Sequence, residues 1–112
     1  MDTIHPAVTF LRTSEFDAWL SALRDPVGRA RVIARIRSAE LGNFGDCEPV
    51  GTGISEMRIH VGAGYRVYFT RKGDVVYLLL CGGSKSTQSR DIKRAKALLA
   101  SMGIRYEKRC CI

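Results

Sequence analysis

Residues 54–81 decide the fold, and they read ISEMRIHVGAGYRVYFTRKGDVVYLLLC. Apolar and polar residues alternate through 54–60 and again through 65–70, which is typical of strands with one buried face. The Gly-Ala-Gly sequence at 62–64 favours a turn between these two strands and so predicts a hairpin. Residues 75–81 are almost continuously apolar, as in an interior strand that is buried on both faces. The stretch therefore predicts an antiparallel meander of three strands.

Two helices are predicted on the N-terminal side of the meander, after a short strand at 7–11. Apolar residues recur at helical spacing in 16–23, which predicts a first helix with one buried face. Asp25 and Pro26 suit the cap and the first turn of a second helix. Residues 42–49 are rich in Gly, Asn, Asp and Pro, and this composition predicts a loop before the meander.

A last helix is predicted after Gly82 and Gly83, which are expected to break the third strand of the meander. Residues 1–103 are thus expected to form a single domain, and residues 104–112 a basic C-terminal tail. The order β-α-α-β-β-β-α predicts an α+β fold. In it, the N-terminal strand and the helical hairpin pack on one face of a three- to four-stranded antiparallel sheet, and the other face stays open.

The composition is that of one ordinary globular domain. The chain has 112 residues, of which 46% are hydrophobic and 26% charged. No stretch approaches the roughly 18 apolar residues of a membrane span, and the N-terminus lacks a secretory pattern. We therefore expect a cytoplasmic protein. Its four cysteines form no CxxC pair and only two histidines accompany them, so we expect neither a metal nor another cofactor.

The net charge of +7 points to an anionic partner. Residues 26–41 carry four basic side chains and one acidic, and residues 84–112 carry eight basic and two acidic. Most of the excess charge thus falls in two predicted helices. Arg31, Arg35 and Lys93 of these helices are predicted RNA contacts, whereas a merely solvated basic face is the alternative interpretation.

The meander also gathers polar residues on one face. The positions that alternate with the apolar ones are Glu56, Arg58, His60, Arg66 and Tyr68. A hairpin centred on Ala63 would set Arg58 nearly opposite Tyr68 and would set His60 opposite Arg66. Such residues also form ordinary cross-strand pairs on many sheets, so Arg58 with Glu56 or Glu48 could be a surface pair without a function.

These residue types suit metal-independent cleavage of RNA, in which a 2′-hydroxyl attacks its own phosphate. The reaction needs positive charge at the phosphorane oxygens, a base near the hydroxyl and an acid near the leaving oxygen. Arg58 and Arg66 are predicted to supply the charge, because a guanidinium group can hold two phosphate oxygens at once. His60 and Tyr68 are the acid or base candidates. Lys85, at the start of the last helix, could add a cation or transfer a proton.

Four motifs follow one another along the chain: LRDPVGRARVIARI, GNFGD, SEMRIHVGAGYRVYF and LLLCGGSKSTQSRDIKRA. In this order and spacing they resemble the addiction module killer protein family, the HigB-like toxins of the RelE/ParE superfamily, over residues 10–100. The resemblance implies the toxin of a type II toxin–antitoxin pair, an endoribonuclease that cleaves mRNA at the ribosome and blocks translation. It also implies that Arg58 and Arg66 stand where RelE-like nucleases bind phosphate, and that Lys85 belongs to a segment of this family.

The resemblance further implies a small DNA-binding antitoxin as partner, through which the toxin would reach operator DNA. An acidic antitoxin segment is expected along the basic helices or across the open sheet face. Two other functions remain open. The superfamily includes ParE-like toxins, which inhibit DNA gyrase by binding, and a degenerate phage-derived binding module is the third interpretation.

Overall fold

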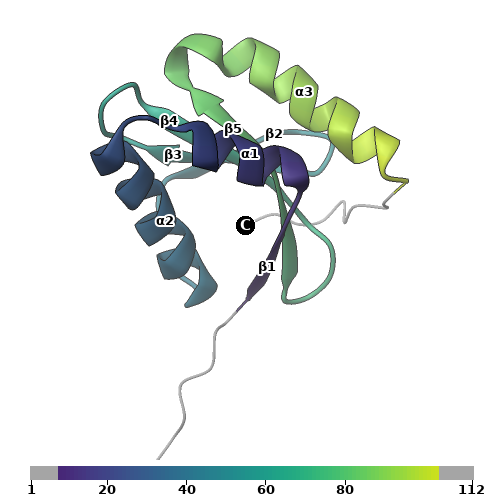
Figure 1. Cartoon of the computed structure of the whole chain (residues 1–112). Helices are drawn as coiled ribbons and strands as arrows, with labels where there is room; N and C mark the ends of the chain where they lie inside the picture. The colour runs from purple at the N-terminus through teal and green to yellow at the C-terminus, as the bar shows by residue number, and fades with distance from the viewer. Residues whose placement is uncertain (1–7, 104–112) are drawn as a thin grey trace, which may run out of the picture.

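The computed structural model describes residues 8–103, and these form a five-stranded sheet with three α-helices (Figure 1). The elements are, in chain order, β1 (Thr9–Arg12), α1 (Ser14–Ala22), α2 (Pro26–Glu40), β2 (Cys47–Gly51), β3 (Ile54–Ile59), β4 (Tyr65–Arg71), β5 (Val76–Ser84), the 3-10 turn η1 (Lys85–Thr87) and α3 (Gln88–Ser101). The strands lie side by side in the order β1-β5-β4-β3-β2. The predicted α+β class is therefore confirmed.

The sheet itself differs from the predicted one in strand number and direction. An additional strand, β2, begins at Cys47 inside the segment that was predicted to be a loop. It lies at the edge of the sheet, where Pro49 is tolerated although it lacks an N–H group. At the other edge β1 pairs with β5 in parallel, so the sheet is mixed rather than antiparallel. Composition does not encode the direction of a pairing between strands that are far apart in the chain.

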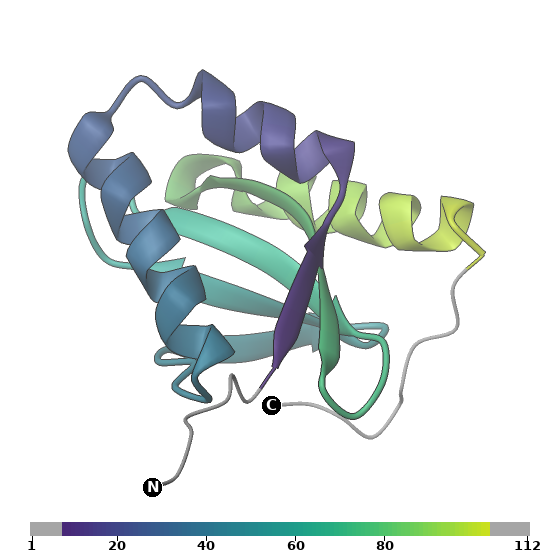
Figure 2. The same ribbon diagram turned by 60° about the horizontal axis from the view of Figure 1, so that its bottom comes forward.

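The helices cover both faces of the sheet, which corrects the prediction that one face is open (Figures 1 and 2). Helices α1 and α2 contribute Phe16, Val32 and Ala39 to the core on one face. Helix α3 contributes Ala95 and Leu99 to a second core on the other face. That second face carries the even-numbered residues of β3 and β4, and the polar candidates are therefore partly covered by α3.

Strand β5 continues through Gly82 and Gly83 to Ser84, whereas the glycine pair was predicted to end it. The glycines serve close packing instead. A Cβ atom at Gly82 would overlap the ring of Trp19 from α1, and one at Gly83 would overlap the carboxyl group of Asp91 from α3. The missing side chains thus let two helices approach the same strand from opposite faces.

The predicted cap at Asp25 is confirmed, and Thr13 caps α1 in the same way. The Thr13 hydroxyl accepts a hydrogen bond from the Phe16 N–H (2.9 Å), and Asp25 accepts one from the Gly28 N–H (3.1 Å). The backbone N–H of Gly28 and the hydroxyl of Tyr65 hold the pKa of Asp25 below its usual value. None of the helices in the described part of the chain is long and apolar enough to cross a membrane. The predicted basic tail at 104–112 lies outside the described residues.

Candidate functional site

The hairpin of β3 and β4 sets Arg58 directly opposite Arg66. Glu56 stands opposite Tyr68, so the predicted pairing of Arg58 with Tyr68 is wrong by two positions. The reason lies in the turn. Residues 60–64 form a five-residue loop centred on Gly62, not on Ala63, and His60 lies beyond the ladder instead of facing Arg66.

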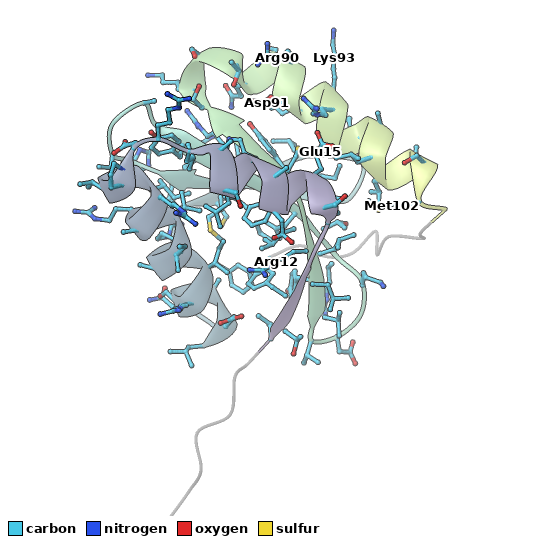
Figure 3. All side chains as sticks on the ribbon, in the orientation of Figure 1. Arg12, Glu15, Arg90, Asp91, Lys93 and Met102 are labelled. Atoms are coloured by element: carbon cyan, nitrogen blue, oxygen red, sulfur yellow. The ribbon has the colours of Figure 1, made fainter. Side chains whose placement is uncertain are left out.

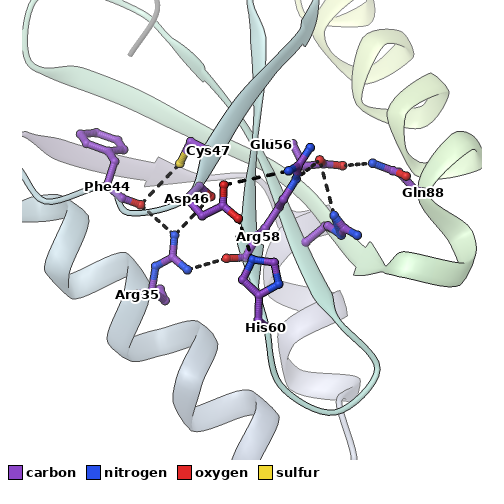
Figure 4. Close-up of polar contacts among 9 residues, drawn as sticks. Arg35, Phe44, Asp46, Cys47, Glu56, Arg58, His60 and Gln88 are labelled. Atoms are coloured by element: carbon purple, nitrogen blue, oxygen red, sulfur yellow. Dashed lines mark hydrogen bonds and ion pairs between the residues drawn. The ribbon is translucent and has the colours of Figure 1, made fainter.

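Glu56 lies at the centre of a cluster of polar side chains under α3 (Figure 4). Its side chain is fully buried, and both carboxylate oxygens are used. Oε1 accepts a hydrogen bond from Arg58 Nε (3.1 Å) and lies 3.6 Å from Arg66 Nη1. Oε2 accepts hydrogen bonds from the Tyr68 hydroxyl (2.9 Å) and from Gln88 Nε2 (2.7 Å). One buried carboxylate thus holds two arginines on the same side of the sheet.

The two arginines differ in their exposure and in their partners. The Arg58 side chain is 31% exposed, and the hydrogen bond with Glu56 raises its pKa further. The Arg66 side chain is only 10% exposed, and its Nε is buried without a hydrogen-bond partner. Burying an under-satisfied guanidinium group is unfavourable, so such a group marks a candidate anion site.

Tyr68 is fully buried in the core under α3, so it is not accessible to a substrate. Burial raises the pKa of its phenol strongly, and the hydrogen bond to Glu56 and the charge of that carboxylate raise it further. In this structure the hydroxyl serves as a donor to Glu56 and remains protonated.

Stability is expected to fall as the pH rises above about 10, the pKa of a free phenol. The folded state binds the Tyr68 proton more tightly than the unfolded state, so this contribution is complete below the unfolded pKa and is lost above it. Urea unfolding of the wild type and of Tyr68→Phe at increasing alkaline pH would measure it. The free energy of unfolding of the variant should decline less than that of the wild type. Parallel declines would show that Tyr68 is not the source of the pH dependence.

His60 projects from the end of β3 and forms the exposed end of the same cluster (Figure 4). Its side chain is 70% exposed, and its Nε2 lies 2.6 Å from Asp46 Oδ2. The other carboxylate oxygen of Asp46 lies 4.0 Å from Arg58 Nη1. Asp46 thus connects the imidazole to the arginine pair.

Lys85 lies at the same end of the sheet as His60. Arg58, Arg66 and Gly83 form one row across β3, β4 and β5. His60 and Lys85 each follow this row by two residues on strands that run in the same direction. The backbone N–H of Lys85 contacts the carbonyl of Ala63 at 3.4 Å, which places it beside the loop. With strands about 4.8 Å apart, the two residues lie on either side of the end of β4.

The three predicted RNA contacts do not share one surface. Arg31 is exposed on α2 and Lys93 is exposed on α3, and these helices cover opposite faces of the sheet; Figure 3 shows Lys93 pointing away from the strands. Arg35 is partly buried and donates to the backbone carbonyls of Arg58 (2.5 Å) and Phe44 (2.8 Å). Arg35 therefore stabilises a loop, and its guanidinium group is largely occupied.

The thiols of Cys47 and Cys81 are protonated at neutral pH. Burial raises the pKa of Cys81 to about 12 and that of Cys47 to about 11. Cys81 lies in the core, as predicted. Cys110 and Cys111 lie outside the described residues. Within residues 8–103, no group of three or more His, Cys, Asp or Glu side chains is arranged to hold a metal ion.

An "Uncharacterized protein" of Haemophilus influenzae is similar to this chain. The two are 49% identical over 92 residues, which is 82% of this chain and 93% of the relative. The chain belongs to the family of this relative. The match thus includes nearly the whole relative. A scan of family models finds no match, and no solved structure matches the chain.

In this member of the family, Asp46 and Gln88 also belong to the cluster, and no pattern in the sequence predicted either of them. Asp46 was assigned to a loop, and its contact with His60 depends on β2 pairing with β3. Gln88 reaches Glu56 from α3, which was not expected on that face. Glu56 itself was considered only as part of a surface pair. Its alternation with apolar neighbours placed it on the correct face, and only the position of α3 shows that the pair is buried.

Proposed function

We propose that the chain is the toxin of a type II toxin–antitoxin pair, a metal-independent endoribonuclease that cleaves mRNA and so blocks translation. The observation that carries this proposal is the cross-strand pair of Arg58 and Arg66 on one buried carboxylate, Glu56. Arg58, Arg66 and Glu56 together carry one positive charge, which Asp46 beside Arg58 partly offsets. That charge complements the single negative charge of an RNA phosphodiester.

The proposed reaction begins when the 2′-oxygen loses its proton and attacks the adjacent phosphorus. The new bond joins the 2′-oxygen to phosphorus, and the bond from phosphorus to the 5′-oxygen breaks, which leaves a 2′,3′-cyclic phosphate and a 5′-hydroxyl. His60 is the base in this scheme, because Tyr68 is buried and protonated. Lys85 supplies the proton of the leaving oxygen from the other side of the end of β4. Arg58 and Arg66 stabilise the charge of the phosphorane.

The wider proposal follows the resemblance of the sequence. We infer a RelE/ParE-like toxin of the cytoplasm that acts at the ribosome and is neutralised by a small DNA-binding antitoxin. The α+β topology and the four basic residues of α2 are compatible with such a partner. The other candidate, a ParE-like gyrase inhibitor, would leave the buried, under-satisfied Arg66 without a role.

Induction in a bacterial host tests this function. The wild-type chain is expected to arrest growth and to create new mRNA 5′ ends, detected by primer extension, and Arg58→Ala should abolish both. The matched control is Lys72→Ala, which also removes one exposed cation but lies in the turn at the opposite end of β4. It should act as the wild type does. Growth arrest without cleavage, together with the DNA-damage response, would overturn the nuclease in favour of gyrase inhibition.

A further inference from the structure

Asp46 contacts both His60 and Arg58. Its Oδ2 lies 2.6 Å from His60 Nε2, and its Oδ1 lies 4.0 Å from Arg58 Nη1 (Figure 4). The carboxylate is 41% exposed, so surface screening makes these ion pairs weak contributors to stability. We therefore expect Asp46 to act by orienting His60 and Arg58 rather than by stabilising the fold.

The backbone around Asp46 is fixed from two sides. Arg35 of α2 donates to the carbonyls of Phe44 (2.8 Å) and Asp46 (3.5 Å), and the Arg58 N–H donates to the Asp46 carbonyl (2.9 Å). Gly45 between them has a φ of +70°, and a Cβ there would lie 2.7 Å from the Arg35 guanidinium. The loop therefore holds Asp46 in one place although the side chain is exposed.

The ionisation of Asp46 determines which nitrogen of His60 is free. The hydrogen bond with His60 holds the pKa of Asp46 below its usual value, so the carboxylate is charged and can only accept. His60 Nε2 must then carry the proton of this hydrogen bond. In the neutral imidazole, Nδ1 is left with its lone pair, as a proton acceptor requires.

We propose that Asp46 is a positioning residue for His60: it fixes the imidazole so that Nδ1 can accept the proton of the 2′-hydroxyl. This inference rests on the proposed function. Asp46 has a second, opposing effect, because its negative charge beside Arg58 weakens the attraction of that arginine for phosphate. Removing the charge should thus slow turnover without weakening RNA binding, a combination that simple loss of structure does not produce.

The test compares Asp46→Asn with the wild type, using the full chain and a defined mRNA in a reconstituted translation reaction. We expect kcat to fall by about tenfold or more, because an unoriented base loses part of its contribution, while KM does not rise. Glu48→Gln is the matched control, since it removes one exposed carboxylate from the neighbouring strand β2 and leaves His60 untouched. Its kcat should equal that of the wild type.

A double variant separates positioning from general destabilisation. If Asp46 acts through His60, Asp46→Asn should cost nothing further in a His60→Ala background. Equal kcat values for Asp46→Asn and the wild type, or additive losses in the double variant, would overturn the inference and leave the nuclease function intact. An inactive wild type would overturn the proposed function, and this inference with it.

Discussion

Replacing Glu56 with alanine is expected to destabilise the protein by about 3–5 kcal/mol, the cost of leaving a buried charge unpaired. Arg66 would lose the only ionic partner it has among residues 8–103, and its side chain is only 10% exposed. Tyr68 and Gln88 would lose the acceptor of their hydrogen bonds as well. The free energy of unfolding in urea measures the loss.

Glu48→Ala is the matched control for this stability experiment. Glu48 is the cross-strand partner of Glu56 on β2, yet it is exposed. Its replacement should change the free energy of unfolding by no more than about 0.5 kcal/mol. If the two variants were equally stable, the carboxylate of Glu56 would not be the group that holds the arginines.

On the proposed function, replacing His60 with alanine is expected to lower kcat for RNA cleavage by about 100-fold or more, the usual contribution of a general base. The side chain is 70% exposed, so the fold should not change and the melting temperature should stay within the error of the measurement. Cleavage of a defined mRNA under saturating substrate would measure the effect.

His60→Gln distinguishes proton transfer from simple polarity. The glutamine amide can still donate a hydrogen bond to Asp46, but it cannot take up a proton at neutral pH. We therefore expect it to be as slow as the alanine variant. Full activity in His60→Gln would show that the imidazole is not the base, and the proposed reaction would then require a different general base.

The sequence predicted those parts of the fold that depend on local patterns. The cap at Asp25 and the strands around Met57 and Val67 follow from side-chain chemistry and spacing within each segment. These local features do not depend on how the rest of the chain folds. The register of the hairpin was wrong because Gly62 and Gly64 both permit a positive φ, so several turn centres are compatible with the sequence. The strand at Cys47 was missed because its composition is that of a loop.

The sequence predicted that the two arginines share a face of the sheet, but it did not predict what surrounds them. Arg58 and Arg66 alternate with apolar residues, and this pattern alone assigns them to one face. That this face is covered depends on α3, whose position no local pattern encodes. Tyr68 was therefore considered as an accessible catalytic group, and it lies in the core. The role of Arg35 was also missed, since its carbonyl partners, Arg58 of β3 and Phe44 of the loop after α2, come together only in the folded chain.

Because α3 covers Glu56, the order in which the chain is synthesised decides when the polar cluster is completed. Gln88, which completes the coordination of Glu56, belongs to the last described helix, so it leaves the ribosome after every strand of the sheet. A nascent chain that ends before α3 has both arginines but lacks the helix that shields their carboxylate from water. The hydrogen bond from Gln88 and the cover over Glu56 are therefore added only once α3 has been synthesised and has packed on the sheet. On the proposed function, the site would reach its final form only after α3 has packed against β3, β4 and β5.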